Sequence, residues 1–357
     1  MIDTLSMNVA QVKELFASLG EPAFRATQYV GWQLKGVPLS EMTNLPKSLR
    51  ERLATVVTDT LPRVERKLVS SIDGTVKYLF RLYDAEVIES VFMRYKHGNT
   101  LCISCEVGCP MGCRFCASTL GGKVRDLLPS EMLGQIIAAE RDSGERISNV
   151  VMMGIGEPLD NFDNVCTFLR LVGDPEGLNI GYRHISLSTC GVVPRIYDLA
   201  KEAFPITLSI SLHASDDEAR SSIMPVNRKW NIQALLDACV FYYKTTGRRI
   251  SFEYTLIAGK NDTEADARAL GRLLKDAFRD TGAPLHVNLI RVNEVVETGM
   301  RQGTVEGANR FADILCHMGL SATVRRRLGS DVNAACGQLR RSEIRERSQA
   351  KEKVEHE

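Results

Sequence analysis

Apolar residues recur along this chain with different periods, and each period predicts one kind of element. From residue 8 to residue 57 they follow a helical spacing that breaks near Pro46, which predicts a compact helical unit over residues 1–60. Over residues 61–99 the period becomes two, and Asp73-Gly74 is typical of a hairpin turn. We therefore expect a small β-hairpin that links the helical unit to the rest of the chain.

Between residues 100 and 339, short β-rich runs alternate with helical stretches such as Ser130–Arg141 and Glu264–Phe278. Six strand-helix units predict an α/β fold, a partial (β/α)6 barrel, in which ligands bind at the C-terminal ends of the strands. The charged segment over residues 340–357 is typical of solvated helix or disorder. The six expected strands are Leu101–Ser104, Asn149–Met153, His184–Thr189, Thr207–Leu212, Ile250–Leu256 and His286–Val292.

Composition says more about the class of protein and its location than about its activity. With 357 residues, 44% hydrophobic and 25% charged, the chain is an ordinary globular protein that we expect to be monomeric. It shows no signal peptide and no apolar run long enough for a membrane span, so we expect a cytoplasmic location. Ten cysteines in such a chain suit a reducing compartment. The net charge of +1 gives no general argument for nucleic acid, so any RNA site must be local.

Three cysteines, Cys109, Cys113 and Cys116, form a CxxxCxxC run after the first expected strand. Thiolates at this spacing can bind three irons of a [4Fe-4S] cluster, whose fourth iron then stays open to an outside ligand. The alternatives are a structural zinc site and three unrelated core cysteines. Zinc usually takes a second short ligand pair such as CxxC or HxxxH, and the sequence has none outside residues 102–116. The run therefore favours a cluster that takes part in chemistry.

Polar residues follow the other expected strands. The second strand runs into Gly154-Ile155-Gly156-Glu157, where glycines would admit a ligand to the backbone and the carboxylate would accept hydrogen bonds from an ammonium group. The third strand contributes Ser188, the fourth gives Ser211-Leu212-His213, and the sixth ends at Asn293. Each alone is more often a polar residue that satisfies a loop. Their shared position at strand ends favours one pocket.

Six segments carry a closer resemblance, which covers nearly the whole chain. They are LCISCEVGCPMGCRFCAST, NVVMMGIGEPLDN, HISLSTCGVVP, SISLHA, MPVN and NAACGQLR. In order and spacing they resemble the RlmN/Cfr family of radical S-adenosylmethionine (SAM) adenine methyltransferases. The resemblance implies one [4Fe-4S] cluster, two SAM molecules per turnover, and SAM contacts at Gly156, Glu157, Ser188, Ser211, Leu212, His213 and Asn293.

The same resemblance implies an RNA substrate. The family acts on one adenosine, adenosine 2503, in the peptidyl-transferase centre of 23S rRNA. RlmN members methylate C2, and also C2 of adenosine 37 in certain tRNAs, whereas Cfr members methylate C8 and confer antibiotic resistance. The stretches GGKVR and LGSDVNAACGQLRR look more like RlmN. An alternative of another class is a non-catalytic metal-cluster protein that binds RNA, which would cleave no SAM.

Two cysteines outside the cluster motif gain roles from the resemblance. Cys336 matches the methyl carrier: a first SAM methylates it, and a radical formed from a second SAM takes a hydrogen from that methyl group. The methylene radical then adds to adenine. Cys102 would attack the sulfur of Cys336, form a transient disulfide and release the methylated base. On a strand Cys102 shares a face with Ser104 while Cys105 points the other way, which favours Cys102 as the partner.

Glu89, thirteen residues before Cys102, matches the family's proton acceptor. Without the resemblance, a solvated strand glutamate would be the better interpretation. Ile88 and Val91 flank it, which suits a general base if the strand is buried. The radical chemistry also needs an electron, so we expect an external donor such as flavodoxin or ferredoxin.

Candidate RNA contacts are the helical N-terminal unit, Arg325-Arg326-Arg327, Arg114 and Phe115, because a splayed adenine needs stacking surfaces and phosphate partners. Two positions depart from the family pattern. Asn293 is followed by glutamate where many relatives have proline, and Cys105 replaces a serine or threonine. The sequence assigns no role to the other cysteines, Cys166, Cys190, Cys239 and Cys316.

Overall fold

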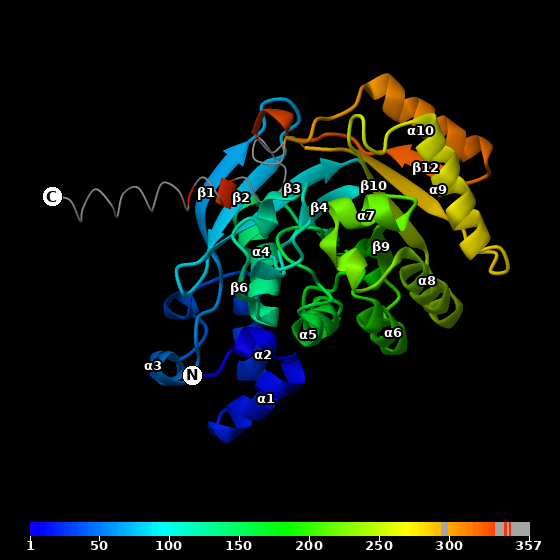
Figure 1. Cartoon of the computed structure of the whole chain (residues 1–357). Coiled ribbons are helices and arrows are strands. Elements are labelled where there is room, and N and C mark those ends of the chain that lie inside the picture. The colour runs from blue at the N-terminus through cyan, green and yellow to red at the C-terminus, as the bar shows by residue number, and fades with distance from the viewer. Residues whose placement is uncertain (294–298, 333–338, 341–342, 344–357) are drawn as a thin grey trace.

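The computed structural model describes residues 1–293, 299–332, 339–340 and 343 (Figure 1). A ten-stranded sheet has the order β1-β2-β3-β4-β7-β8-β9-β10-β11-β12. Strands β1 to β4 pair antiparallel, and the pairs from β4 to β12 are parallel. The strands of this sheet are β1 Arg63–Val69, β2 Val76–Arg81, β3 Val87–Tyr95, β4 Gly98–Cys102, β7 Asn149–Met152, β8 Ile185–Thr189, β9 Thr207–Ser211, β10 Ile250–Leu256, β11 His286–Arg291 and β12 Ser321–Val324.

Helices alternate with the parallel strands and lie along the outer side of the curved sheet (Figure 1). The sheet order ends at β1 on one edge and β12 on the other, so the barrel is partial, as the sequence predicts. None of the described helices is long and apolar enough to cross a bilayer. The helices of this part are α4 Pro129–Ser143, α5 Phe162–Val172, α6 Val193–Glu202, α7 Asp217–Ile223, α8 Ile232–Thr246, α9 Glu264–Ala277 and α10 Val305–His317.

The parallel strands have one apolar face and one polar face. Leu187, Leu208 and Phe252 pack into the main core, together with the helices of the outer layer. On the other face, neighbouring strands align Ser188 with Ser209 and Glu253 with Asn288. Because successive side chains of a strand point to opposite faces, most polar residues of β8 to β11 gather on the concave inner face of the sheet, and Thr189 and Arg291 at the strand ends are the exceptions.

The N-terminal helices form a unit with a hydrophobic core of its own. Helices α1 Val9–Ser18, α2 Ala23–Gln33 and α3 Lys47–Val56 enclose buried side chains that include Phe16 and Leu53. An Asn8 capping box starts α1, with the Asn8 side chain accepting from the backbone N–H of Gln11. The Oγ of Ser6 accepts a hydrogen bond from the backbone N–H of Ser130 at 3.0 Å, which ties this unit to the start of α4.

The predicted hairpin is confirmed, and it is continuous with the barrel. β1 and β2 pair antiparallel on either side of Asp73-Gly74, with Gly74 at φ 71°. β3 pairs with both β2 and β4, so these strands extend the barrel sheet. Two features were not anticipated: β12 adds a seventh parallel strand, and β5 Glu106–Gly108 pairs with β6 Lys123–Asp126 as a separate ribbon.

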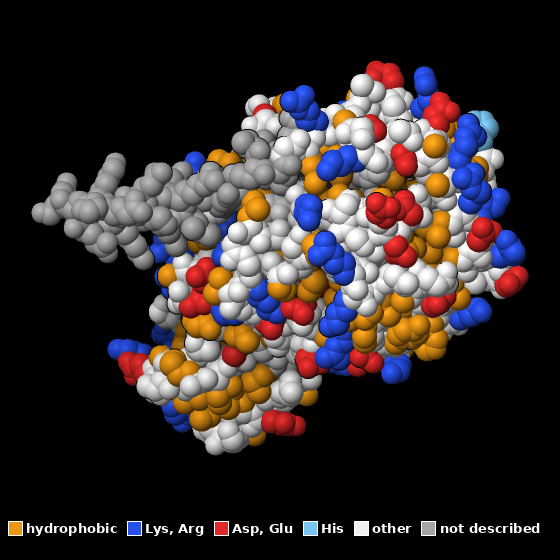
Figure 2. All heavy atoms as spheres, in the orientation of Figure 1, with side chains coloured by type: hydrophobic (Ala, Val, Ile, Leu, Met, Phe, Trp, Pro, Cys, Tyr) orange, Lys and Arg blue, Asp and Glu red, His pale blue; other side chains and the backbone are white. Residues whose placement is uncertain are grey.

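Charge on the surface is mixed. Figure 2 shows acidic side chains scattered over one face, with Lys and Arg side chains gathered in a band down its middle. Apolar side chains gather over α1 and α2, where Phe24 is exposed, and over α6 and α8, where Tyr197 and Phe241 pack together. Although the net charge is only +1, the charged side chains are unevenly distributed over this face.

Candidate active site

The CxxxCxxC loop is carried by the β5–β6 ribbon. The backbone N–H of Cys109 donates to the carbonyl of Gly122 at 3.1 Å, and that of Arg114 donates to the carbonyl of Ile223 in α7 at 2.9 Å. Cys109 and Cys113 are buried, and Cys116 is half-buried. The loop is thus fixed both to its own ribbon and to α7.

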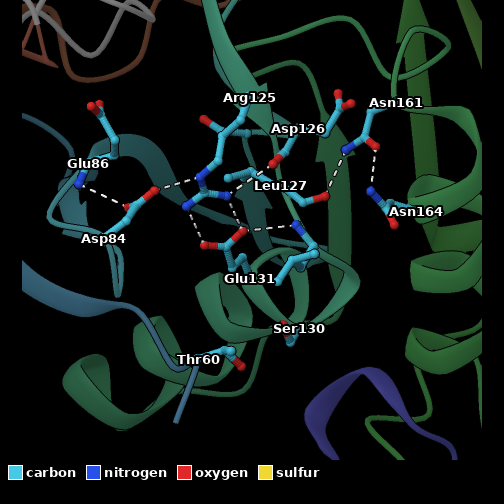
Figure 3. Close-up of polar contacts among 12 residues, drawn as sticks. Thr60, Asp84, Glu86, Arg125, Asp126, Leu127, Ser130, Glu131, Asn161 and Asn164 are labelled. Carbon is cyan, nitrogen blue, oxygen red and sulfur yellow. Dashed lines mark hydrogen bonds and ion pairs between the residues drawn. The ribbon is translucent and has the colours of Figure 1, made fainter. Parts of the chain in front are cut away.

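The ribbon is anchored to α4 by Arg125 of β6 (Figure 3). The Arg125 guanidinium makes two hydrogen bonds to Glu131, at 2.7 and 2.8 Å, and its Nε donates to Asp84 at 2.6 Å. The same Glu131 carboxylate accepts from the backbone N–H of Leu128, which begins the helix. A bidentate arginine pair fixes orientation as well as position, so these contacts hold β6 and with it the cysteine loop.

Three carboxylates beside this loop share one lysine as their ion-pair partner. Lys123 Nζ lies 2.8 Å from Glu106, 2.8 Å from Asp126 and 2.6 Å from Asp160. Burial raises the pKa of Glu106 to about 7, although Lys123 opposes this shift. The Lys123 ammonium group occupies the position that a metal ion would take. The three carboxylates are therefore explained as an ion-pair network.

The three thiols of the motif are not gathered around one point as the ligands of a single zinc ion would be. All three cysteines are described, and their Sγ atoms do not all lie within 4.8 Å of one another. A tetrahedral zinc ion with bonds near 2.3 Å would bring sulfurs to about 3.8 Å. Burial raises the pKa of Cys113 to about 12, so a bound metal has to displace its proton.

A cavity of about 260 Å³ lies next to the cysteines, at the C-terminal ends of the parallel strands. The cysteines of the motif line it together with residues that the sequence predicts to bind SAM. Leu212 is the exception, because its side chain is fully buried in the main core and is absent from the lining. The predicted residues in the lining are Gly156, Glu157, Ser188, Ser211, His213 and Asn293.

Glu157 is held rigidly at the wall of this cavity. Its carboxylate accepts from the backbone N–H of Cys190 at 2.7 Å and from that of Leu159 at 3.0 Å. Burial raises its pKa, and these hydrogen bonds oppose the shift. The glycines beside it are required by packing: a Cβ at Gly154 would lie 2.5 Å from the carbonyl oxygen of Ile103, and Gly156 has φ 113°. Chain packing therefore accounts for both glycines without a ligand.

His213 lies in the cavity in an unusual backbone conformation, with φ 59°. Its Nδ1 accepts from the backbone N–H of Thr255 at 2.9 Å, and its ring meets Phe115 of the cysteine loop edge to face, with centroids 4.8 Å apart. Burial lowers its pKa to about 3, helped by Arg220. His213 is therefore a neutral residue that joins β9, β10 and the cysteine loop.

Arg220 and Glu253 belong to the site, although sequence reasoning did not find them. The fully buried guanidinium of Arg220 donates to the carbonyls of Cys190 at 2.7 Å and Ser211 at 3.0 Å, which joins two strand ends. Glu253 lines the cavity from β10 and accepts from Asn288 Nδ2 at 2.6 Å. Burial raises the pKa of Glu253. The signal for Glu253 was the charged residue inside the apolar run Ile250–Leu256.

Glu89 and Cys102 lie on the same face of neighbouring strands. Val91 of β3 stands opposite Cys102 of β4, and Glu89 is two residues from Val91, so all three point to one side of the sheet. The Glu89 carboxylate pairs with Lys77 Nζ at 3.1 Å and accepts from the backbone N–H of Arg340 at 2.5 Å. Cys336, the expected methyl carrier, lies outside the described residues.

The remaining residues singled out from the sequence differ in burial and in whether they line the cavity. Arg325, Arg326 and Arg327 are exposed, and Arg325 also lines the cavity. Asn293 ends the described part of its loop, so the following Glu294 lies outside it. Cys105 is a packing residue of the main core. Of the four unassigned cysteines, Cys166 and Cys239 are buried in the core, Cys190 lines the cavity, and Cys316 is exposed.

Comparison with known proteins supports this picture. Residues 103–270 match the Radical SAM superfamily, and residues 2–58 match the ribosomal RNA large subunit methyltransferase N-terminal domain. The chain is 52% identical over 344 residues to a probable dual-specificity RNA methyltransferase RlmN from Alkaliphilus oremlandii, covering 96% of this chain and 98% of the relative. A protein with the same description from Clostridium botulinum is 52% identical over 326 residues, 91% of this chain and 92% of that relative.

A solved structure is similar over almost its whole length. It is a radical SAM methyltransferase from Sphaerobacter thermophilus, with a TM-score of 0.88 and 42% sequence identity, and the match covers 95% of this chain and 99% of that one. The similarity includes the helical N-terminal unit, the sheet and the helices around it, since so much of both chains is covered.

Proposed function

Since this chain belongs to the RlmN family of radical SAM methyltransferases, we propose that it methylates C2 of an adenosine in the peptidyl-transferase centre of 23S rRNA. The observation that carries the proposal is one cavity in which the three cysteines of the CxxxCxxC motif meet the predicted SAM-binding residues. A non-catalytic binding protein has no need for this combination.

The description of the relatives as dual-specificity enzymes supports a second RNA substrate, which we propose to be adenosine 37 of tRNA. The same description favours C2 over the C8 position that Cfr members modify. Arg325, Arg326 and Arg327 support binding of the RNA backbone, because they are exposed and begin at the edge of the cavity. The helical N-terminal unit is a second candidate for RNA contact.

Residues around the cavity divide into those that hold the cofactors and those that act on the base. Cys109, Cys113 and Cys116 would hold the cluster, which supplies the electron that cleaves SAM when it is bound and reduced. Glu157 is placed to orient the SAM amino group, and Ser188, Ser211, His213 and Asn293 would complete the walls. Backbone hydrogen bonds from Cys190 and Leu159 already hold the Glu157 carboxylate in place.

We assign the resolution of the RNA adduct to Cys336, Cys102 and Glu89. After the adduct radical has given up one electron to the oxidised form of the redox donor, Glu89 takes the proton from C2, and the electron pair of that C–H bond returns to the ring. The Cys102 thiolate then attacks the sulfur of Cys336, the bond from that sulfur to the methylene carbon breaks, and this carbon takes up a proton to become the methyl group. The shared face of Glu89 and Cys102 supports these roles.

The proposal also includes an electron donor and a setting. A small redox protein such as flavodoxin or ferredoxin would supply the electron, in the cytoplasm, to a monomeric enzyme. The nine described cysteines are all free thiols, which suits a reducing compartment.

Product analysis tests the proposed function. Under anaerobic conditions the reconstituted protein receives a reductant, SAM and either a 23S rRNA fragment or tRNA, and digested RNA is compared with synthetic standards by mass spectrometry. We expect 2-methyladenosine with the wild type and with Cys316→Ala, an exposed cysteine that serves as the control. Cys336→Ala should give none. 8-Methyladenosine would move the chain to the Cfr type, and absence of SAM cleavage would leave the binding-protein alternative.

A further inference from the structure

A lysine and a glutamate form a buried ion pair beside the proposed base. Lys77 Nζ of β2 lies 3.1 Å from Glu89 Oε2 of β3, and the two side chains are 1% and 2% exposed. Removing two charges from water costs several kcal/mol, and a well-packed apolar pair would often be as stable. A pair in this position therefore calls for a reason other than stability.

The strand register places this pair in the row of side chains that leads to Cys102. Val91 stands opposite Lys77 on one side and opposite Cys102 on the other. Since directly opposed side chains share a face, Lys77 and Cys102 lie on the same face as Glu89. The ion pair is thus part of the inner face that carries the resolving thiol.

The charged and titratable groups that face Glu89 come from three elements. Lys77 belongs to β2 and Cys102 to β4, whereas Arg340 belongs to the segment that follows Cys336. The Arg340 guanidinium itself turns away, because its Nε donates to the carbonyl of Val87 at 2.8 Å and it pairs with Glu86 at 3.4 Å. Lys77 therefore places its positive charge directly against the Glu89 carboxylate.

We propose that Lys77 is a positioning residue that keeps Glu89 ionised and aimed for proton removal from the RNA adduct. This inference rests on the proposed function. A buried carboxylate without a cation favours its protonated form, which cannot accept a proton. With Lys77 present, the proton of the C2–H bond passes to a Glu89 oxygen, its electron pair stays in the ring, and Lys77 keeps its own proton throughout.

The test is the pH dependence of product release in a single turnover. Because release also needs the Cys102 thiolate, the rate of every variant rises with pH, and the test compares each variant with the wild type at the same pH. Lys77→Met should fall behind the wild type at acidic pH by a ratio that shrinks about tenfold for each pH unit until Glu89 ionises. Lys77→Arg should keep a constant ratio to the wild type at every pH. Lys67→Met is the matched control, because Lys67 belongs to the same hairpin but forms its ion pair, with Asp142, at the surface. If Lys77→Met released product more slowly than the wild type by the same factor at every pH, the inference would be overturned.

Two further variants separate the inference from the proposed function. If Glu89→Gln releases product as the wild type does, the assignment of Glu89 as base fails, whatever Lys77 does. Unfolding supplies a readout without catalysis: Lys77→Met should lose stability as pH rises, since its carboxylate must ionise while buried, and the double variant Lys77→Met/Glu89→Gln should not. Equal pH dependence in the two would show that Lys77 does not control the charge of Glu89.

Discussion

His213 shows how one side chain can connect the walls of the site. Its ring touches the cysteine loop through Phe115, its Nδ1 accepts from Thr255, and its backbone carbonyl accepts from Asn261 Nδ2 at 2.8 Å. Each contact uses the neutral imidazole or the backbone. Protonation of the ring would therefore remove the acceptor at Nδ1 and introduce a buried charge next to Arg220.

This arrangement predicts a pH-dependent stability. The pKa of His213 is about 3 in the folded chain and 6.5 as the ordinary value, so its contribution is complete above pH 6.5 and is lost as pH falls toward 3. His213→Asn keeps an acceptor and tolerates positive φ. Between pH 6.5 and about 5, wild type should lose about 2 kcal/mol more unfolding free energy than the variant in denaturant titrations. Equal losses would mean that His213 is protonated in the fold.

Arg220 is the second residue whose substitution has a clear expected effect. Its guanidinium donates to three backbone carbonyls, of Cys190, Ser211 and Leu212, and to the side chain of Asn227. Arg220→Met would leave these buried acceptors without a donor and should lower the free energy of unfolding by roughly 3 kcal/mol. Arg195→Met removes an exposed ion pair with Asp198 and should cost less than about 0.5 kcal/mol. A small effect for both would show that water replaces Arg220.

At the level of elements, the β5–β6 ribbon holds the loop that carries the three motif cysteines. Gly108 has φ 82°, and a Cβ there would lie 1.9 Å from the carbonyl oxygen of Gly122. Gly108→Ala should therefore open the ribbon, at a cost of roughly 1–3 kcal/mol, and lower the iron bound per chain after reconstitution. Gly121→Ala is the control in the same loop, because a Cβ there meets nothing within 4 Å. Equal iron content in both variants would contradict this role of the ribbon.

Elements with a strong local signal could be predicted from the sequence. Asp73-Gly74 marks the hairpin, and the apolar runs of β8 to β10 alternate with the helices that cover them. β12 has only four residues, Ser321–Val324, and they are exposed or half-buried, so no apolar pattern announces it. Leu212 lies between two residues that line the cavity, Ser211 and His213, but the period of two turns its side chain to the core.

At the scale of the whole molecule, residues far apart in sequence meet on the inner face of one sheet. The Arg340 backbone reaches Glu89 across 251 positions, and Leu339 packs with Leu79 and Val87. The family resemblance could supply the roles of Glu89 and Cys102, but the Lys77 pair depends on the register of β2 against β3, which sequence alone does not fix.

The central claim is that methyl transfer proceeds through a covalent bond between RNA and Cys336, which Cys102 resolves. The most direct measurement is to run Cys102→Ala anaerobically with SAM, a reductant and the rRNA fragment, then digest the protein and map any RNA-linked peptide by mass spectrometry. We expect the adduct to accumulate on the peptide that contains Cys336, and the wild type to show little of it. No adduct in Cys102→Ala, or an adduct on another cysteine, would contradict the account.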